Sequence, residues 1–524
     1  MMYDAIVIGS GFGGALAAYP LVHAGWKVLM LERGDWVARG PQCWSPDGVR
    51  DLTPYYDRTT PYTVRGDDRM QQAGVHCVGG ASVFYGGVSL RFREQDFGPE
   101  PQERAAGARW PFGYDTLEPY YAAAERLIGV AGEAGTDPTE PWRSTAYPQR
   151  VPPLSRTACR IADAGARLGL TPFRLPLALN HTSRHGQNTC ISCNTCDGYA
   201  CAIGAKNDIA SAILPELIAH GMRVLPHTAA TRLVTEGRRI TGVETIDTRT
   251  HARRSHDARF VIVAAGALAT PHLLLASGLQ HMSSAPAHVG ATLMRHCNSI
   301  VFGIFPRRLD PAREFHKQVG FNDLYLGDGN SPALGRLGTI QQIHAPPVGL
   351  VRTMLPGPLA RVGERLLDRM TGLIAIAADT PQQRNCVELM DGHDALGMPR
   401  ARVSHRYTAR DRAARRVLAH AAARVLSEAG ALVTFTMPIR TFSHGLGTVR
   451  MGEAEAANPL DATNRFRGID NLYVTDASAL PTAGGVNPSL TIAAVAYRAG
   501  CLLAAQHPVQ RRTKSRIQLE VIHA

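Results

Sequence analysis

The chain contains almost no lysine. Only four of its 56 basic residues are lysines, Lys27, Lys206, Lys317 and Lys514, and the arginines are scattered along the 524 positions. The formal net charge of +12 therefore reflects arginine usage. A nucleic-acid footprint would be a basic patch clustered on one face with interleaved aromatics, which this pattern does not resemble. We expect no nucleic-acid partner, although the last residues, 509–524, form a small basic tail.

The sequence also lacks a long uninterrupted apolar run. Its most apolar stretch, residues 260–279, is broken by Gly266, Pro271 and His272, which argues against a membrane span. No leader-like segment precedes the first apolar run at residues 3–8. Six of the ten cysteines are scattered, a usage that fits a reducing compartment. We therefore expect a cytoplasmic protein without a membrane span.

The N-terminal segment reads as strand, glycine-rich turn, helix and second strand. The apolar run at residues 3–8 leads into Gly-Ser-Gly-Phe-Gly-Gly at 9–14, and an alanine-rich stretch follows to about Ala24. The next apolar run, 27–31, ends at Glu32. This order, with an acid after the second strand, is typical of a dinucleotide-binding unit.

Each residue type in that unit has a physical role. Gly9 permits the tight turn, Gly11 lets the backbone approach a pyrophosphate, and Gly14 lets helix and strand pack closely. The phosphates are expected at the helix N-terminus, where free N–H groups and the helix dipole favour anions. Glu32 is expected to accept hydrogen bonds from the adenosine ribose hydroxyls. The motif alone does not separate NAD from FAD.

Three further segments favour FAD. Residues 77–87 form a second glycine-rich loop, suited to close backbone approach to a flat ring or to phosphates. Residues 261–278 read as a buried strand that turns at Gly266 into a helix beginning near Thr270-Pro271. The third segment, 443–491, carries a histidine in a glycine-rich turn and an Asn-Pro pair.

Taken together, these segments resemble the glucose-methanol-choline (GMC) family of FAD-dependent alcohol oxidoreductases. The matching motifs occur at 6–34, 77–94, 261–278 and 443–500. The resemblance implies an α/β fold, in which a Rossmann-type FAD-binding domain carries a second, α+β substrate domain built on an antiparallel sheet. It also implies oxidation of an alcohol CH–OH to a carbonyl, by proton abstraction and hydride transfer to flavin N5.

The variant of the second glycine loop narrows this resemblance. The loop contains Gly79-Gly80 and Phe84-Tyr85-Gly86, followed by Arg91 and Arg93. This pattern resembles the corresponding loop of the bacterial sugar-oxidising branch of the family, which includes enzymes acting on glycosides and aminoglycosides. Residues 485–491 also resemble cholesterol oxidase. A dehydrogenase of a sterol or other apolar alcohol therefore remains the alternative. In either case the partners would be a small-molecule alcohol and either oxygen or an external electron acceptor.

The resemblance also implies which residues bind FAD. Ala230 looks like a backbone contact to adenine, Asp476 would contact the ribityl or pyrophosphate region, and the Asn487-Pro488 backbone would lie near the pyrimidine edge of the flavin. Tyr85 stands where the family often has asparagine, so aromatic packing is the alternative to a polar contact there. The full set comprises Gly9, Gly11, Phe12, Gly13, Gly14, Glu32, Arg33, Gly79, Gly80, Ser82, Tyr85, Gly86, Ala230, Ala265, Gly266, Asp476, Ala477, Pro488 and Thr491.

The predicted catalytic pair is His444 and Asn487. An imidazole titrates near neutrality, which suits a general base that removes an alcohol proton. Pro488 disfavours the helical conformation at Asn487 and so holds its amide in place. That amide would stabilise developing alkoxide charge, and one such donor contributes about 3 kcal/mol.

Four cysteines lie close together in sequence, at Cys190, Cys193, Cys196 and Cys201. Thiolates suit zinc or an iron–sulfur cluster, and some GMC dehydrogenases are similar in carrying a cluster that relays electrons to an outside acceptor. The spacing does not reproduce the ferredoxin-type runs. A structural loop, with packed thiols or one or two disulfides, is the other interpretation, and the sequence leaves the choice open.

A chain of this length predicts two domains. The motifs place the FAD-binding domain at 1–98, 202–290 and 438–508, and the substrate domain at 99–201 and 291–437. Within the substrate domain, 372–377 and 385–390 are predicted strands, and 411–429 is a predicted helix packed on their sheet. Residues 40–75 are a candidate lid over the flavin entrance. His296, His316 and His344 are polar candidates, each expected to be a surface or satisfied core residue.

Overall fold

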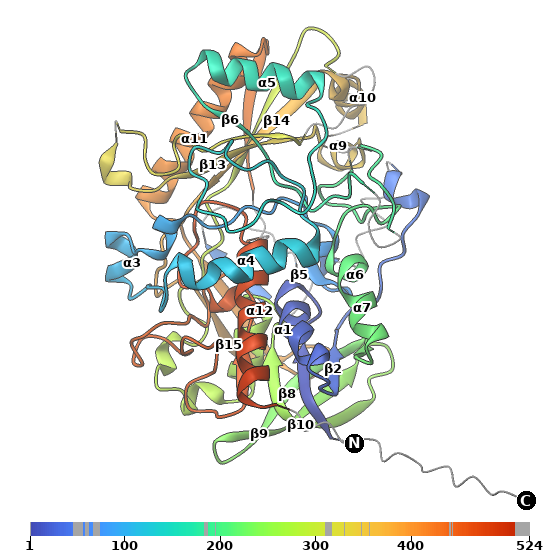
Figure 1. Cartoon of the computed structure of the whole chain (residues 1–524), viewed down its shortest axis with the longest axis vertical. Coiled ribbons are helices and arrows are strands. Elements are labelled where there is room, and N and C mark those ends of the chain that lie inside the picture. Colours follow the sequence, from blue (N-terminus) through green and yellow to red (C-terminus); the bar gives the residue numbers. More distant parts are fainter. Residues whose placement is uncertain are drawn as a thin grey trace, which may run out of the picture.

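The structure of the chain is a computed structural model (Figure 1). It describes residues 2–45, 56–57, 62–66, 74–182, 187–193, 195–309, 317–329, 331–346, 348–355, 357–439, 442 and 444–508. His316, the tail at 509–524 and most of the predicted lid at 40–75 lie outside the described residues.

A mostly parallel sheet forms the lower half of the molecule in Figure 1. Its strand order is β7-β2-β1-β10-β9-β8, with β18 paired to β10. Strands β7, β2, β1, β10 and β18 pair in parallel, whereas β9 and β8 continue from β10 in antiparallel fashion. The bounds are β1 Tyr3–Ile8, β2 Val28–Leu31, β7 Arg223–Leu225, β8 Thr228–Glu236, β9 Arg239–Asp247, β10 Arg253–Val263 and β18 Leu472–Val474.

These strands come from three distant parts of the chain, 3–31, 223–263 and 472–474. Their apolar runs are buried, as expected for parallel strands covered on both faces. Each part lies inside one of the three predicted pieces of the FAD-binding domain, whose outer boundaries remain predictions.

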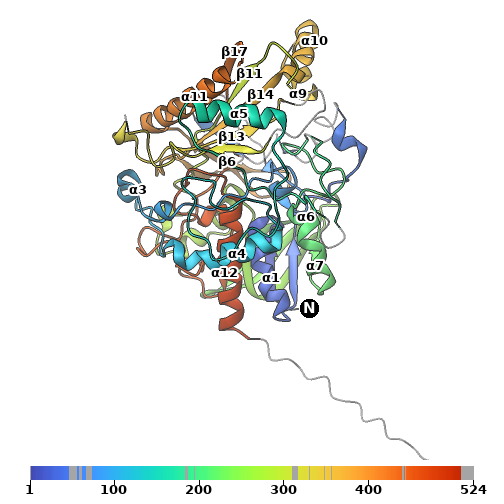
Figure 2. The same cartoon turned by 45° about the horizontal axis from the view of Figure 1, so that its top comes forward.

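Two helices, α1 (Phe12–His23) and α12 (Ser489–Gln506), lie side by side on this sheet. In Figures 1 and 2 both run outward from the middle of the molecule, so that their N-terminal ends are directed to the centre. A Cβ atom on Gly500 would lie 2.3 Å from the backbone oxygen of Ala17, so glycine is required for this close packing. Helix α4 (Tyr114–Ile128) packs on α12.

Among the described residues, α12 is the one helix that is long and apolar enough to cross a membrane. Half of its apolar window is buried inside the protein, against α1 and α4, which is the behaviour of a core helix. Its length and composition are therefore weak evidence for a span.

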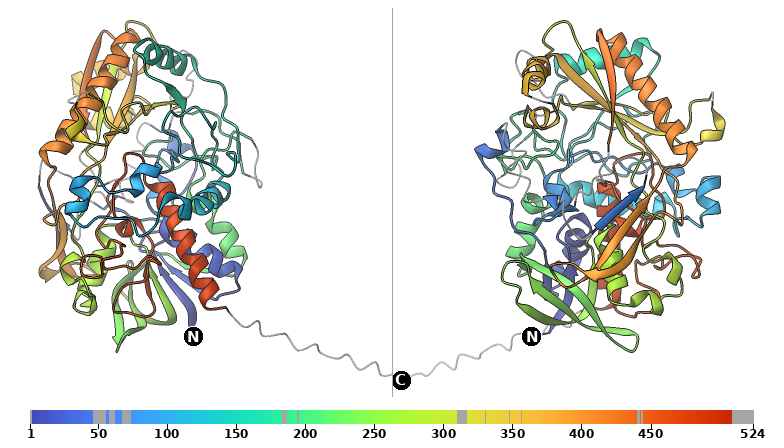
Figure 3. Two further views of the ribbon diagram at one scale, coloured as in Figure 1. Left: turned by 60° about the vertical axis from the view of Figure 1, so that its left-hand side comes forward. Right: turned by 180° about the vertical axis from the view of Figure 1, so that it is seen from behind.

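A second sheet, entirely antiparallel, forms the opposite end of the molecule (Figure 3). Its order is β17-β11-β14-β13-β12-β6. Helices α5 (Arg156–Arg167) and α11 (Ala409–Glu428) cover its outer face and share a core with it. The strands are β6 Pro172–Arg174, β11 Ser299–Ile304, β12 Val319–Phe321, β13 Gly338–Ile343, β14 Met370–Ala377 and β17 Val433–Pro438.

Of the elements predicted for this domain, 372–377 lies in β14, and 411–429 corresponds to α11 packed on the sheet. The placement of 385–390 is wrong. This segment is a strand, β15 (Cys386–His393), but it pairs with β16 (Pro399–His405), which pairs with β4 (Tyr62–Gly66), in a separate three-stranded sheet. Alternating hydrophobicity predicts a strand but does not specify which strand it pairs with. Here β15 pairs with β16, the next strand along the chain, after a short connection.

The predicted fold class is confirmed, with one Rossmann-type α/β layer system and one antiparallel sheet covered by helices. Among the described residues, the remaining α-helices are α3 Pro101–Ala105, α6 Ile209–Ala212, α7 Leu214–Ala219, α8 Ala269–Ala276, α9 Val348–Met354 and α10 Gly357–Leu366, and the remaining strands are β3 Tyr56–Asp57 and β5 Gly74–Val75. The carboxyl ends of the parallel strands and the N-terminal ends of α1 and α12 face the second sheet across the middle of the molecule.

Candidate active site

The two predicted glycine loops meet at the N-terminal end of α1. The backbone N–H of Gly79 donates to Oγ of Ser10 at 2.9 Å. A Cβ atom on Gly80 would lie 3.2 Å from Cα of Gly11, so the two backbones are almost in contact. The two loops are far apart in sequence and adjacent in space, and together they form a cradle lined by backbone groups.

The first loop tolerates no side chain at three of its glycines. A Cβ atom on Gly9 would lie 2.2 Å from the oxygen of Ala264, and Gly9 has φ +103°, which L-residues rarely adopt. A Cβ atom on Gly13 would lie 2.7 Å from the backbone oxygen of Thr475. A Cβ atom on Gly14 would lie 2.0 Å from the backbone oxygen of Gly9. The N-cap residue of α1 is Gly11, and no side chain caps the first N–H groups of the helix. Those N–H groups are therefore available to bind an anion.

Glu32 follows β2 and faces this cradle. Its carboxylate accepts hydrogen bonds from the N–H and the hydroxyl of Ser10, at 3.2 and 2.5 Å, and from the N–H of Gly34 at 3.0 Å. Burial raises its pKa. The predicted ribose acceptor is therefore held rigidly at the carboxyl end of its strand. Arg33, beside it, and Ala230, on β8, are both partly buried.

Side-chain contacts fix the shape of the second loop. Ser82 donates its hydroxyl to the oxygen of Gly79 at 2.6 Å and accepts from the N–H of Ile209 at 3.0 Å. The hydroxyl of Tyr85 donates to the oxygen of Asn207 at 2.8 Å, and its ring packs edge-on against Phe12 with centroids 5.4 Å apart. Tyr85 thus contributes aromatic packing at the point where the two loops meet.

An ion pair between a buried lysine and a partly exposed aspartate lies directly on the second loop. Lys317, which is 5% exposed, pairs with Asp197. A Cβ atom on Gly86 would lie 2.0 Å from Nζ of Lys317 and 2.1 Å from Oδ1 of Asp197. Burial opposes ionisation of Asp197, but Lys317 and His344 together hold its pKa below the usual value. Sequence reasoning missed this pair; the scarcity of lysine was the available signal.

Asp476 connects the Gly266 turn to the C-terminal segment. Its carboxylate accepts from the N–H of Gly266 at 2.8 Å and from the hydroxyl of Thr270, and from the N–H and hydroxyl of Ser478 at 2.8 and 2.6 Å. Burial raises its pKa. These four bonds turn the side chain toward the protein, and a contact with the cofactor stays a prediction for Asp476.

Two neighbours of that connection are also held by hydrogen bonds. The N–H of Ala265 donates to the hydroxyl of Thr270 at 3.1 Å. The oxygen of Ala477 accepts from the N–H of Gly447 at 3.0 Å, which places the turn after His444 against the segment that contains Asp476. The three C-terminal motifs are therefore one connected structure.

His444 lies against a second histidine. Its Nδ1 is 3.0 Å from Nδ1 of His296, and the two rings are nearly perpendicular. Nε2 of His296 lies 3.0 Å from the oxygen of Ala483 and 3.1 Å from that of Gly484. Burial, with smaller effects of His296 and Lys317, lowers the pKa of His444 to about 3. The imidazole is therefore neutral, and able to accept a proton, throughout the physiological range.

His296 also connects His444 to the turn that precedes Asn487. It contacts His444 with one ring nitrogen and the loop three residues before Asn487 with the other. His296 was predicted to be a surface or satisfied core residue, and it is a fully buried one. Its position directly beside His444 could not be predicted from the sequence.

The side-chain amide of Asn487 is oriented by Gln341, a buried residue of β13. Nε2 of Gln341 donates to Oδ1 of Asn487 at 2.8 Å. This contact leaves the N–H groups of Asn487 to donate elsewhere, as a stabiliser of alkoxide charge must. Pro488 is the N-cap of α12, and the hydroxyl of Thr491 in its first turn pairs with that of Tyr121 at 2.7 Å.

The cysteine loop is attached to the second glycine loop by Lys206. This fully buried lysine donates to the backbone oxygens of Tyr85, Cys196 and Tyr199 at 2.7, 2.9 and 2.8 Å. All ten cysteines are free, so the predicted alternative of disulfides is not supported. Within the described part of the chain, the sulfurs of Cys190, Cys193, Cys196 and Cys201 do not form a metal-ligand group. Burial raises the pKa of Cys190.

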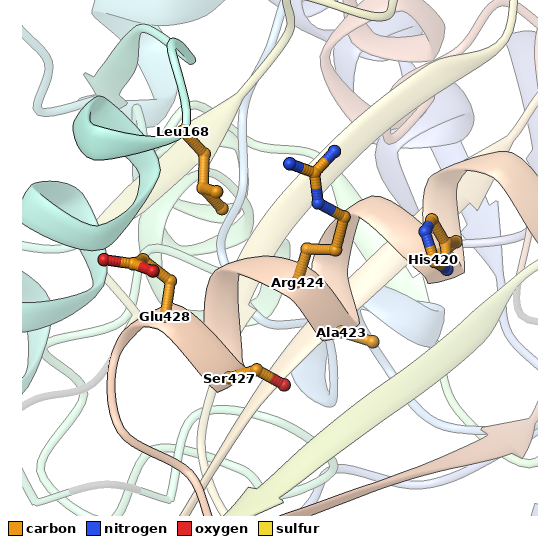
Figure 4. A pocket seen from close by; sticks show the side chains of 6 residues that line it. All are labelled: Leu168, His420, Ala423, Arg424, Ser427 and Glu428. Carbon is orange, nitrogen blue, oxygen red and sulfur yellow. The ribbon is translucent and has the colours of Figure 1, made fainter.

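Two other features lie away from this site. A pocket between α5 and the end of α11 (Figure 4) is lined by Leu168, His420, Ala423, Arg424, Ser427 and Glu428 on the outer side of the second domain. The described residues contain one group that could hold a metal ion, formed by His23 on α1, Glu216 on α7 and His220 directly after α7, and it is exposed. Neither contributes to the cradle or to the histidine pair.

The backbone cradle, the uncapped N-terminus of α1, the acid after β2 and the partly buried, neutral imidazole of His444 are the features expected of a dinucleotide-binding oxidoreductase. Sequence profiles of the GMC oxidoreductase family match residues 3–298 and 381–496. The chain belongs to the GMC oxidoreductase family, and it is an enzyme that acts on alcohol CH–OH groups with a flavin cofactor.

Several characterised relatives are similar over nearly the whole length. The chain is 30% identical to 6'''-hydroxyparomomycin C oxidase of Streptomyces lividus, over 97% of this chain and 93% of that one. It is 30% identical to paromamine 6'-oxidase of Streptomyces fradiae, over 95% of this chain and 90% of the relative. It is 29% identical to 2-methyl-1,2-propanediol dehydrogenase of Mycolicibacterium austroafricanum, over 95% of this chain and 94% of the relative. Pyridoxine 4-oxidase from Mesorbium loti shares the fold, with a TM-score of 0.67, 19% identity and coverage of 96% and 99%.

Proposed function

We propose that the protein binds FAD and oxidises a hydroxyl group of a sugar, glycoside or aminoglycoside-like molecule to a carbonyl. His444 is the general base and Asn487 the hydrogen-bond donor to the reacting oxygen. The observation that carries this proposal is the contact of His296 with both His444 and the 483–484 turn, which links a neutral, partly buried imidazole to the turn that precedes the Asn-Pro pair.

The residues of the cradle fit the dinucleotide part of FAD. The diphosphate would lie at the Gly9–Gly14 turn, between the uncapped end of α1 and the Gly79-Gly80 backbone, where no side chain intrudes. Glu32 would hold the adenosine ribose. The flavin ring would lie toward Tyr85, Gly86 and the Asn487-Pro488 turn, and when bound it takes up the hydride at N5.

The protein's own part in the reaction is placement and proton transfer. A hydroxyl group between His444 and Asn487 would give its proton to His444 as its carbon loses the hydride. The amide N–H of Asn487 stabilises the negative charge that develops on that oxygen, and Gln341 keeps the amide turned this way. Orientation of the substrate C–H bond supplies a further share of the rate enhancement.

Polar groups around the base favour a polar substrate. The Lys317–Asp197 pair lies on Gly86, and Oδ2 of Asp197 is a buried acceptor without a hydrogen-bond partner among the described residues. A substrate hydroxyl or ammonium group would satisfy that oxygen, whereas an apolar alcohol would leave it unpaired at a cost of about 1–3 kcal/mol. Two relatives are named as oxidases of 6'''-hydroxyparomomycin C and of paromamine, which supports a polar substrate for this chain.

An anaerobic bleaching assay tests the proposal. The purified flavoprotein would be mixed without oxygen with a panel of sugars, aminoglycosides, sterols and long-chain alcohols, and the flavin absorbance would be followed. We expect bleaching by polyhydroxylated substrates and a loss of about a hundredfold to ten-thousandfold in rate in His444→Ala. Bleaching only by apolar alcohols would overturn the substrate class, and full bleaching by His444→Ala would overturn the assignment of the base.

The same experiment addresses the electron acceptor. Reoxidation by air, compared with reoxidation by an added dye, separates an oxidase from a dehydrogenase. Iron analysis and the visible spectrum test the alternative of a cysteine-ligated cluster, because such a cluster adds a broad absorbance beside the flavin peaks. A cytoplasmic location, which the sequence predicts, is part of the proposal and would be tested by cell fractionation.

A further inference from the structure

We propose that His296 is a positioning residue that fixes the tautomer of His444, so that His444 carries its proton on Nδ1 and presents an unprotonated Nε2 to the substrate. This inference rests on the proposed role of His444 as the base. It adds the nitrogen that accepts the proton and the residue that selects it.

The argument starts from the surroundings of His296. Its Nε2 faces the carbonyl oxygens of Ala483 and Gly484, at 3.0 and 3.1 Å, and these oxygens can only accept hydrogen bonds. Nε2 must therefore carry a hydrogen. Burial lowers the pKa of His296, so the ring is neutral and has a single N–H. Its Nδ1 is consequently an acceptor.

The tautomer of His444 follows from that of His296. The two Nδ1 atoms are 3.0 Å apart, a hydrogen-bond distance, and one of them must donate. Since Nδ1 of His296 can only accept, Nδ1 of His444 is the donor. A neutral His444 with Nδ1–H has its lone pair on Nε2, at the far side of the ring from His296. When Nε2 of His444 takes a proton, the hydrogen bond from Nδ1 of His444 to Nδ1 of His296 is kept. The positive charge on the His444 ring then faces the lone pair of His296.

His296 is held firmly enough to impose this choice. Its backbone is in the left-handed region, with φ +60°. The carboxylate of Asp379 accepts from the N–H groups of Arg295 and His296, at 2.9 and 3.0 Å, and the hydroxyl of Tyr407 donates to the oxygen of His296 at 2.7 Å. Both backbone groups and both ring nitrogens are thus engaged.

Several charged and titratable groups among the described residues act on the histidine pair. Asp379 is buried and also contacts His405, and despite its burial these neighbours hold its pKa below the usual value. Asp96 and Lys317, also among the described residues, act on the two rings as well. The Tyr407 hydroxyl and the backbone neighbour Arg295 lie beside them. Within the described ranges, the hydrogen-bond partner of the His444 ring is His296, which is therefore the contact that sets its tautomer.

Two substitutions separate positioning from simple packing. In His296→Asn, Oδ1 can occupy the place of Nδ1 and accept from His444, and asparagine tolerates a positive φ. His296→Ala removes the acceptor. Both variants lose the Nε2–H bonds to Ala483 and Gly484. They differ at the contact with His444 and in backbone strain at the positive φ, and the strain is detected as a change in flavin content or Tm. A third variant, His296→Asp, puts a carboxylate at that contact.

The readouts are the rate of anaerobic flavin reduction and the pH dependence of kcat/KM, with flavin content and Tm as checks on folding. We expect His296→Asn to stay within about tenfold of the unmodified enzyme and His296→Ala to lose about a hundredfold, the lower end of the effect of a general base. In His296→Asp the acid limb of kcat/KM should move to higher pH, because a carboxylate favours the protonated form of His444.

Equal rates in the Asn and Ala variants, or an unchanged acid limb in His296→Asp, would overturn the inference. If His296→Ala does not fold, the comparison of the Asn and Asp variants still decides it through the pH limb. Failure of the proposed function has a different signature. His444→Ala would then reduce the flavin at the unmodified rate, whatever happens at His296.

Discussion

Gln341 donates its side-chain N–H to Oδ1 of Asn487 at 2.8 Å. An amide side chain can present either its oxygen or its nitrogen to a substrate, and only the nitrogen stabilises an alkoxide. Gln341 occupies the oxygen of Asn487 and thereby turns its N–H groups outward. The second sheet thus supplies the group that orients the donor, just as the segment before β11 supplies His296 behind the base.

This contact predicts the effect of Gln341→Glu. A carboxylate can only accept, so the amide of Asn487 would turn its N–H groups toward the new carboxylate and its oxygen toward the substrate. We expect kcat to fall by about tenfold to a hundredfold, a part of the effect of losing an oxyanion donor. Flavin content should be unchanged. In Gln341→Leu the amide of Asn487 is free to turn either way, so kcat should fall less than in Gln341→Glu. An unaltered kcat in Gln341→Glu would contradict the assigned orientation of Asn487.

The cofactor cradle predicts that Gly9→Ala loses flavin. The added methyl group would lie 2.2 Å from the oxygen of Ala264, and the positive φ adds strain of about 1–2 kcal/mol. The control is Gly25→Ala, because Gly25 also has a positive φ, +85°, but nothing lies within 4 Å of its Cβ position. The ratio of flavin to protein absorbance should drop for Gly9→Ala alone. A similar drop in both variants would mean that backbone strain, and not the cradle, controls flavin binding.

These features differ in how far the sequence predicts them. The glycine turns, Glu32 and the Asn-Pro pair are local patterns, and each reflects a backbone requirement that only certain residues meet. Gln341, Lys317 and His296 come from strands or loops of the other domain, and tertiary packing brings them to the site. Polar residues inside the fully buried strand β13 are the one local sign of Gln341, since buried polar groups need partners.

The buried cation near the base predicts a shifted pH profile for Lys317→Met. The positive charge of Lys317 lowers the pKa of His444, in addition to the larger effect of burial. Without that charge the pKa rises, so the acid limb of kcat/KM should move to higher pH. The unpaired carboxylate of Asp197 acts in the same direction. Lys27→Met, at an exposed lysine just before β2, should leave the limb in place.

A limb that moves to lower pH, or moves equally in both lysine variants, would contradict this account of the site. The measurement also needs intact flavin binding, because Lys317 rests on Gly86 of the second glycine loop. Flavin content would therefore be determined for each variant before its pH profile is compared.

The neutral state of His444 also predicts how stability depends on pH. Its pKa is about 3 in the folded protein and 6.5 in the ordinary, solvated state. Above pH 6.5 neither state binds a proton at this residue, and its contribution to stability is complete. As the pH falls below 6.5, the unfolded chain takes up a proton that the folded chain does not, so stability is lost until the folded pKa is reached. The slope from this one group is about 1.4 kcal/mol per pH unit.

His444→Asn should therefore flatten the acid side of the stability profile. The free energy of unfolding would be measured by urea denaturation with saturating FAD, in both proteins, between about pH 7.5 and about pH 4.5. The difference in unfolding free energy between His444→Asn and the unmodified protein should be constant above about pH 6.5. Below that value it should change in favour of the variant by about 1.4 kcal/mol for each pH unit. Parallel profiles at all pH values would mean that His444 becomes protonated in the folded protein. The acid limb of kcat/KM should then lie near the ordinary pKa of histidine and not far below it, which would contradict the lowered pKa of His444 in the folded protein.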